Sequence, residues 1–295
     1  MGRRSFAGLV LGATFGALSA IGCSVTTADL PRPGTCDPFE LTAVDPAPDS
    51  EGIAPDVVPA LTFNDFPDPD TIDVSTVLLF TGFYYHTGRY WVDLVDRRAF
   101  FRPSGQLGMG LGYTLSLRPG IRSLRGCQLD GTSTVPGSPG GPNQSPTFRF
   151  QIVAPGARRN PSPLTLPATS FGQLMGILSS HCAGGACHLG TGDALPPDGL
   201  CASSPAGGLS LCARDARDAM VGVPSRQVSR LVLVVPHDSA RSYLLRKIIG
   251  APPVVGHVGV PDDTLSQDDQ RAIADWIDTG APGAPESAEA NDGGI

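Results

Sequence analysis

Three residues in the second half of the chain combine two thiols and an imidazole at a spacing that suits covalent attachment of a cofactor. Cys182 and Cys187 are separated by four residues, and His188 follows directly. In a Cys-x-x-Cys-His segment, both thiols add to the vinyl groups of a haem and the His binds its iron from the proximal side. Residues 183–186 are only Ala and Gly, so two extra residues can bulge outward without moving the anchors. The segment therefore predicts one covalently bound haem c.

The residues around this motif predict the helices that must position it. An apolar stripe of helical period begins at Phe171 and continues up to the motif. A second helix is expected behind Ser239 and a third behind Ser266, with Gly280 as the stop of the third. These short helices predict a small all-α domain over residues 169–282.

Residues 170–282 resemble the small single-haem cytochrome c domains of exported myxobacterial and planctomycete proteins. The resemblance rests on the haem motif, a variant that several of those domains share, and on four later segments in the same order. These segments are GGLSL from Gly207, VGVPSRQV from Val221, LVVPHDSARSYLLRKIIG from Leu233 and VPDDTLSQDDQRAIADWIDTGAP from Val260. The resemblance implies that Cys182 and Cys187 are thioether anchors and that His188 is the proximal iron ligand. It also implies electron transfer with a redox partner that the sequence does not identify.

One position departs from these relatives. They usually carry Met-Pro before the last helix, the Met being the distal iron ligand, whereas this chain has Val260 and Pro261. His257, in the same Gly-rich loop, is the expected substitute and implies a bis-His haem of lower reduction potential than a His/Met haem. The alternatives are a vacant or water-bound position, Met220, Met175 and His237.

Two other interpretations of this half stay open. In the first, the domain has lost its haem, Cys182 and Cys187 form a plain disulfide, and the protein is a structural lipoprotein. In the second, an open distal position permits peroxidase-like chemistry at the iron. The sequence contains no Ser/His/Asp order, phosphate-binding Gly loop or convincing carboxylate pair that would support other catalysis. We therefore do not expect an enzyme.

The first half of the chain consists of short runs of β-forming residues between Pro, Gly and Asp clusters, which predicts an antiparallel sandwich. The runs are residues 57–63, 75–80, 90–94, 98–101, 113–117 and 148–152. Over residues 40–153 the motifs resemble the Ig-like domains of bacterial surface-layer proteins and lipoproteins. The matching residues are Pro103, Leu107, Tyr113, Leu115, Leu117 and Gly126. The resemblance implies a spacer without catalytic residues. The predicted fold class is thus an all-β Ig-like sandwich followed by a small all-α cytochrome c-like domain.

The N-terminus predicts export. Residues 1–22 combine a short positive start with an apolar stretch too short to span a membrane comfortably, which is typical of a signal peptide. The end of this stretch and Cys23 resemble a bacterial lipobox, in which the Cys is lipidated and begins the mature chain. Because Ser24 is not the Asp associated with inner-membrane retention, the resemblance implies an outer-membrane lipoprotein that faces the periplasm or the cell surface. An ordinary signal peptide cleaved elsewhere is the alternative.

Export places the other cysteines in an oxidising compartment, where disulfides form. The chain has seven cysteines, so six remain if Cys23 carries lipid. Cys36 lies just before the sandwich and Cys127 near its end, and we expect these two to pair. Cys201 and Cys212 flank a short insertion and are expected to form a local disulfide.

Charge limits the possible partners. The formal net charge of −7 offers no basic face for phosphates, which argues against a nucleic-acid partner. The expected partners are a redox protein and, through the lipid at Cys23, a membrane. A tether over residues 23–39, a Pro-rich linker over residues 154–168 and a solvated tail over residues 283–295 complete the predicted organisation.

Overall fold

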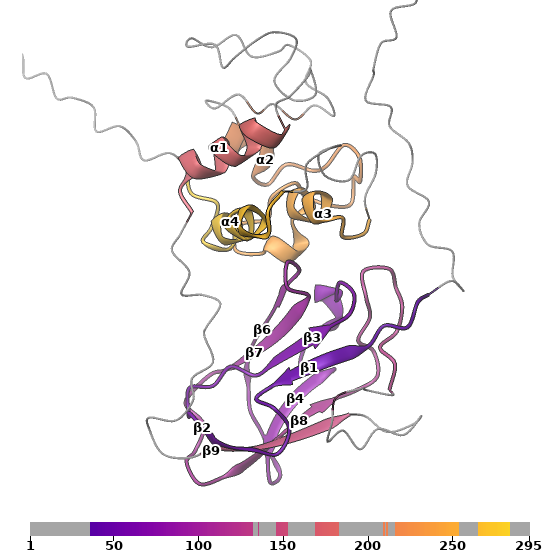
Figure 1. Ribbon diagram of the computed structural model, residues 1–295, viewed down its shortest axis with the longest axis vertical. Coiled ribbons are helices and arrows are strands. Elements are labelled where there is room, and N and C mark those ends of the chain that lie inside the picture. Colours follow the sequence, from indigo (N-terminus) through magenta and orange to yellow (C-terminus); the bar gives the residue numbers. More distant parts are fainter. Residues whose placement is uncertain are drawn as a thin grey trace, which may run out of the picture.

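The computed structural model describes residues 36–131, 135, 146–152, 169–182, 209, 211, 216–253 and 265–283 of the 295-residue chain. Two β-sheets form one end of the described structure, and the helices gather at the other (Figure 1). One sheet has the strand order β1-β3-β7-β6 and the other has the order β2-β9-β8-β4-β5. The strands are β1 (Leu41–Asp45), β2 (Ser50–Ile53), β3 (Ala60–Phe63), β4 (Val77–Thr81), β5 (Tyr84–Tyr85), β6 (Gly88–Asp93), β7 (Arg98–Pro103), β8 (Gly112–Leu117) and β9 (Thr147–Ile152).

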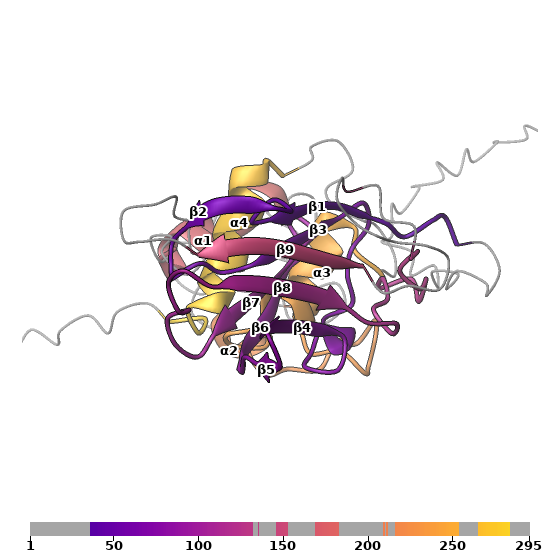
Figure 2. The same cartoon turned by 90° about the horizontal axis from the view of Figure 1, so that it is seen from below.

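Alternating burial along the strands explains how the two sheets pack. In β8, Tyr113, Leu115 and Leu117 are buried and the residues between them are not, and Phe148 and Phe150 follow the same pattern in β9. Because side chains alternate between the faces of a strand, one face of the five-stranded sheet enters the core. The other sheet contributes Leu41, Leu61, Phe63, Val92 and Phe101 to the same core. Seen from below, the strands of the five-stranded sheet lie in front of the helices (Figure 2).

A disulfide bond ties the beginning of the described chain to the sandwich. Cys36 and Cys127 are bonded, with their Cα atoms 5.6 Å apart, which confirms the predicted pairing. Phe39 forms a β-bridge with Leu129, so the backbone beside the disulfide is also paired. The other cysteines with predicted roles in lipidation or disulfides, Cys23, Cys201 and Cys212, lie outside the described residues.

The helices begin and end at local signals in the sequence. The Ser170 hydroxyl accepts a hydrogen bond from the Gln173 amide, and the Gln173 side chain accepts one from the Ser170 amide, which is a capping box. The Ser266 hydroxyl likewise accepts from the Asp269 amide at 3.1 Å. Gly250 ends α3 in the left-handed conformation (φ 73°) that Gly adopts without strain. The elements are η1 (Pro69–Thr71), α1 (Phe171–Cys182), α2 (Ala216–Met220), η5 (Ser239–Arg241), α3 (Tyr243–Ile249) and α4 (Gln267–Asp278).

These helices do not form the separate all-α cytochrome c-like domain that the sequence suggested, and the predicted fold class is wrong. The described chain is mainly β-sheet, with nine strands, and its longest helices have 12 residues. Ala240 and Ala251 belong to the hydrophobic core of the sandwich. The physical reason is that such short helices bury little apolar surface by themselves and gain stability by packing on the sandwich. None of the described helices is both long and apolar enough to cross a lipid bilayer.

Candidate functional site

Cys182 is the predicted haem anchor that the structure describes. It is the last residue of α1, and its half-buried side chain packs against a second hydrophobic core. We call this core the helical core; its fully buried members include Leu174, Met220, Leu245, Ile273, Trp276 and Ile277. The thiol of Cys182 is free. Burial raises the pKa of Cys182, and the nearby charge of Lys247 opposes that rise. The site thus holds a protonated thiol at the edge of an apolar core.

Packing of α1 determines where this thiol lies. Phe171, Leu174 and Leu178 are buried and recur at helical spacing, so they form one face of α1. The Phe171 ring lies 6.2 Å from the Trp276 ring of α4, measured between centroids. Cys182 follows Leu178 by four residues and therefore lies on the same face of the helix. The helical core thereby holds the first residue of the motif in a defined place.

Lys247 lies close enough to Cys182 for its charge to act on the thiol, a proximity that the sequence analysis missed. Its ammonium group donates a hydrogen bond to the side-chain oxygen of Gln227 at 2.5 Å, and the Tyr243 hydroxyl donates to the same oxygen at 3.2 Å. Tyr243 and Lys247 lie one turn apart on α3, so Gln227 fixes both. Lys247 is the only lysine in the chain, and this was the one feature of the sequence that could have drawn attention to it. Because Lys247 and Cys182 are far apart along the sequence, their proximity could not be predicted from it.

The structure separates the candidates for the sixth iron ligand. Met220 is fully buried in the helical core, and Met175 packs against it. His237 lies elsewhere, with its Nδ1 atom 3.2 Å from the carbonyl oxygen of Asp278. Met175 and Met220 therefore share a core with Cys182, whereas His237 does not. The other predicted haem residues, Cys187, His188 and His257, lie outside the described residues.

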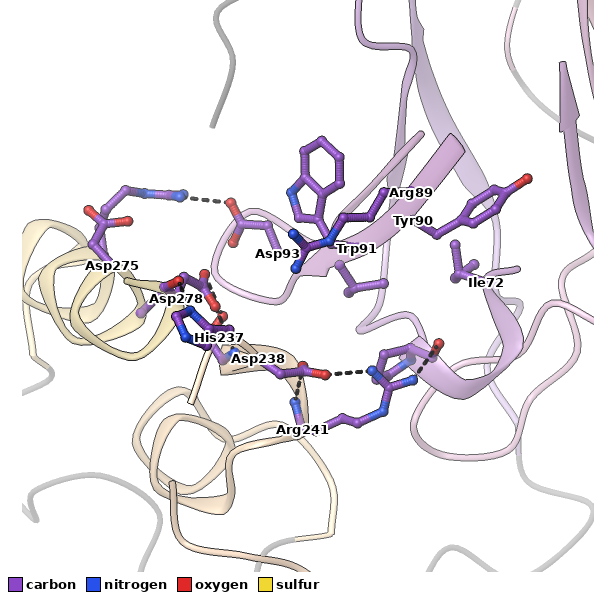
Figure 3. A pocket seen from close by; sticks show the side chains of 15 residues that line it. Ile72, Arg89, Tyr90, Trp91, Asp93, His237, Asp238, Arg241, Asp275 and Asp278 are labelled. Atoms are coloured by element: carbon purple, nitrogen blue, oxygen red, sulfur yellow. Dashed lines mark hydrogen bonds and ion pairs between the residues drawn. The ribbon is translucent and has the colours of Figure 1, made fainter. Parts of the chain in front are cut away.

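A second group of titratable side chains lines a pocket between the sandwich and the helices (Figure 3). The pocket has a volume of about 220 Å³. Arg89, Trp91 and Asp93 of β6 line it from the sandwich. His237, Asp238, Arg241, Arg271, Asp275 and Asp278 line it from the helical side. The sequence analysis did not identify this pocket, because its two walls are far apart along the chain.

Ion pairs across this pocket join the helices to the sandwich. Arg271 of α4 contacts the carboxylate of Asp93 at 2.7 Å and that of Asp96 at 2.6 Å. Arg241 of η5 contacts Asp70 at 2.8 Å. Because the Asp93 and Arg271 side chains are largely shielded from water, their attraction is screened less than that of an exposed pair. We call this set of ion pairs the docking joint.

Burial raises the pKa of two carboxyl groups of α4 that line this pocket. Asp278 accepts hydrogen bonds from the amide and the hydroxyl of Ser239 at 2.8 and 2.9 Å, while burial raises its pKa. Burial also raises the pKa of Asp275 from 3.8 to about 6; the charge of Arg271 opposes this rise, and those of Asp278 and Asp93 add to it. No three His, Cys, Asp or Glu side chains among the described residues are arranged to hold a metal ion.

Replacing Asp275 with Asn is expected to stabilise the protein above neutral pH and to have no effect in acid. A carboxyl group whose pKa is higher in the folded state adds most to the free energy of unfolding below its unfolded pKa. That stabilisation is lost as the pH rises through the folded pKa of about 6. After allowance for solvent screening of a half-buried group, the gain in free energy of unfolding should be about 1 kcal/mol at about pH 8. Urea unfolding at about pH 8 and about pH 4 measures it. Asp218→Asn is the control, because the Asp218 side chain of α2 is exposed, and an equal gain at both pH values would contradict the assignment.

No known protein family and no curated protein matches this chain. Among solved structures, it is similar to the N-terminal part of the bacterial S-layer protein SbsC, with 15% identity and a TM-score of 0.29 over 45% of this chain and 28% of that one. It is also similar to CopC from Methylosinus trichosporium OB3b, with 12% identity and a TM-score of 0.28 over 42% of this chain and 97% of that one. The copper resistance protein PcoC from Escherichia coli gives 15% identity and a TM-score of 0.26, over 39% and 99% of the two chains. The match spans little more than a quarter of the S-layer chain, and all three likenesses are too distant to bear on function.

Proposed function

We propose that the protein is an exported electron-transfer protein that carries one covalently bound haem c. Cys182 and Cys187 form the thioether bonds, His188 is the proximal iron ligand and His257 is the distal ligand. The bound haem supplies one-electron chemistry at its iron. The protein matrix supplies attachment, orientation and a partly apolar surrounding, and a separate redox protein exchanges the electron.

The position of Cys182 carries this proposal. Its free thiol lies at the end of α1, at the edge of an apolar core that also contains Met220. A haem is a large apolar ring, so its attached edge suits a thiol that borders such a core.

The docking joint gives the proposed haem segment a fixed platform. Arg271 and Arg241 hold the helices on the sandwich through Asp93, Asp96 and Asp70. The sandwich then acts as a spacer that carries the haem segment, in place of the separate cytochrome domain that the structure excludes. Electron transfer benefits from such rigidity because little reorganisation accompanies the change in iron charge.

Export is part of the same proposal. The Cys36–Cys127 disulfide suits an oxidising compartment, and residues 1–22 supply a signal peptide. Lipid at Cys23 anchors the mature chain to the outer membrane. The exported location is also where covalent haem attachment to a bacterial chain would take place.

Expression of the full chain in a bacterial host that has cytochrome c maturation machinery tests the proposed function. We expect a Soret absorption band and a mass increase of one haem that survives denaturation. The double variant Cys182→Ala/Cys187→Ala should lose both signals, because no thioether can form. The matched control is His181→Ala, which changes the neighbouring residue at the end of the same helix and should keep the haem.

Two results would contradict haem binding. A colourless product with the mass of the polypeptide alone would reject the proposal outright. A colourless product in which Cys182 and Cys187 are found disulfide-linked by mass mapping would favour the structural lipoprotein instead.

A further inference from the structure

Most of the charged groups in the pocket between the sandwich and the helices already have partners. The docking joint pairs the arginines of the helical side with acids of the sandwich, and Arg241 also contacts Asp238 at 2.6 Å. Both carboxylate oxygens of Asp278 accept hydrogen bonds from Ser239. These groups are satisfied within the protein and do not need a ligand.

Two side chains of opposite charge remain, one on each wall of the pocket. Among the described residues, neither the Arg89 guanidinium nor the Asp275 carboxyl group makes a hydrogen bond or an ion pair. Arg89 extends from β6 toward the helical side, where Asp275 lies on α4 (Figure 3). The two groups do not reach each other, because the pocket of about 220 Å³ lies between the walls that carry them.

Neither of these two charges stabilises the fold. Arg89 lies directly opposite Arg102 in the antiparallel pairing of β6 with β7, and like charges at such positions oppose pairing. Asp275 is half-buried, and burial raises its pKa to about 6, so its ionised form is destabilised in the folded protein. Charged groups that lower stability and line a pocket are typical of binding sites.

We propose that this pocket binds a small zwitterion with a carboxylate at one end and an ammonium group at the other. The carboxylate accepts hydrogen bonds from the planar guanidinium of Arg89. The ammonium group donates to the carboxylate of Asp275, and Asp278, one turn further along α4, adds negative charge on the same side. Pockets between structural units commonly bind small molecules, and this one suits a molecule smaller than a drug-sized ligand. The proposal does not depend on haem.

The opposite charges of the two walls favour a zwitterion over a simple ion. A simple anion beside Arg89 would face the carboxyl groups of α4, and a simple amine beside Asp275 would face the guanidinium of Arg89. In a zwitterion each charge meets its opposite, so both walls contribute to binding. The ion pair between Arg271 and Asp93 joins the two walls and fixes their separation, so one length of ligand should fit best.

Isothermal titration calorimetry of the full chain tests the proposal with a series of zwitterions: glycine, 4-aminobutyrate and 6-aminohexanoate. Butylamine and butyrate serve as comparisons, because each carries only one of the two charges. We expect the best-fitting zwitterion to bind at least about tenfold more tightly than either comparison, since it makes charge-assisted hydrogen bonds to both walls.

Two single variants assign the two ends of the ligand. Arg89→Gln should bind the zwitterion no more tightly than butylamine, and should still bind butylamine at least as well as the parent chain, which shows that the helical wall is intact. Asp275→Asn should bind the zwitterion no more tightly than butyrate. Arg118→Gln and Asp218→Asn are the matched controls, because both side chains are exposed outside the pocket, and they should bind like the parent chain.

Three results would overturn the proposal. The first is absence of binding by all three zwitterions, and the second is unchanged zwitterion binding by both pocket variants. The third is binding of butylamine or butyrate as tight as that of the best zwitterion, which would assign the pocket to a simple cation or anion instead.

Discussion

A chain in which Cys36 and Cys127 are both replaced by Ala is expected to lose about 4.5 kcal/mol of unfolding free energy, because their disulfide joins residues separated by 91 positions. In the chain-entropy account, the bond acts mainly by restricting the unfolded chain, and a longer loop is restricted more. Ala is the suitable replacement because Cys127 is buried, and a Ser there would place a hydroxyl in the core. The loss would be a large share of the stability of a typical domain.

Urea unfolding of the Ala/Ala variant measures this effect. The midpoint should fall, and the slope of free energy against urea should rise because the unfolded chain without a crosslink exposes more surface. Reduction of the parent chain should reproduce the loss, whereas Cys182→Ala, which leaves the Cys36–Cys127 disulfide intact, should not change the slope. A loss below about 1 kcal/mol would mean that β-pairing alone holds this segment in place.

Replacing Trp276 with Ala is expected to lower the free energy of unfolding by about 4 kcal/mol, the second largest effect among these predictions. Trp276 is fully buried at the centre of the helical core. Its indole N–H donates a hydrogen bond to the carbonyl of Pro282 at 3.0 Å. Truncation leaves a cavity where the ring packed near Phe171 and removes the donor for that carbonyl. Both losses act on the segment that carries Cys182.

Thermal unfolding followed by circular dichroism tests two points: how much this substitution destabilises the protein, and whether the helices and the sandwich unfold together. Ala240 lies in the sandwich core and Arg271 crosses the docking joint, so the helices and the sandwich should unfold in one transition that shifts to lower temperature. Trp91→Ala is the comparison on the sandwich side of the pocket, because Trp91 is only partly buried and stacks on Phe100. The Trp91 variant should lose less than half as much free energy of unfolding as the Trp276 variant. Two separate transitions in the Trp276 variant would show that the two parts unfold independently.

Local patterns in the sequence predicted many of the elements well. Residues 98–101 and 113–117 lie in β7 and β8, and the residues behind Ser266 form α4. These predictions depend on alternation of apolar residues and on caps, which are properties of neighbours along the chain. In contrast, β2 was missed because it contains a Ser, a Glu and a Gly and shows no run of β-forming residues, and its stability comes from parallel pairing with β9. Pairing over such a separation leaves little trace in a local pattern.

The candidate site was predicted only in part. The motif that begins at Cys182 was recognised because its reactive residues lie close together in the sequence. The disulfide between Cys36 and Cys127 was predicted because these two cysteines flank the sandwich. Lys247 and the docking joint were missed, since Arg271 and Asp93 are 178 residues apart in the chain. The predicted separate cytochrome domain failed for a related reason: helical period shows which face of a helix is apolar but not what covers it.

The sequence by itself determined the chemical groups that are present, namely the thiols and imidazoles of the haem motif, the capped helices and the β-forming runs of the sandwich. Those features depend on covalent order and on interactions within a few residues. Only the tertiary structure decided that Cys182 borders an apolar core near Lys247, that the helices complete the sandwich core, and that aromatic rings project from its edge. The reason is that burial and charge pairing depend on which distant segments share a volume, and that becomes defined only when the chain has folded.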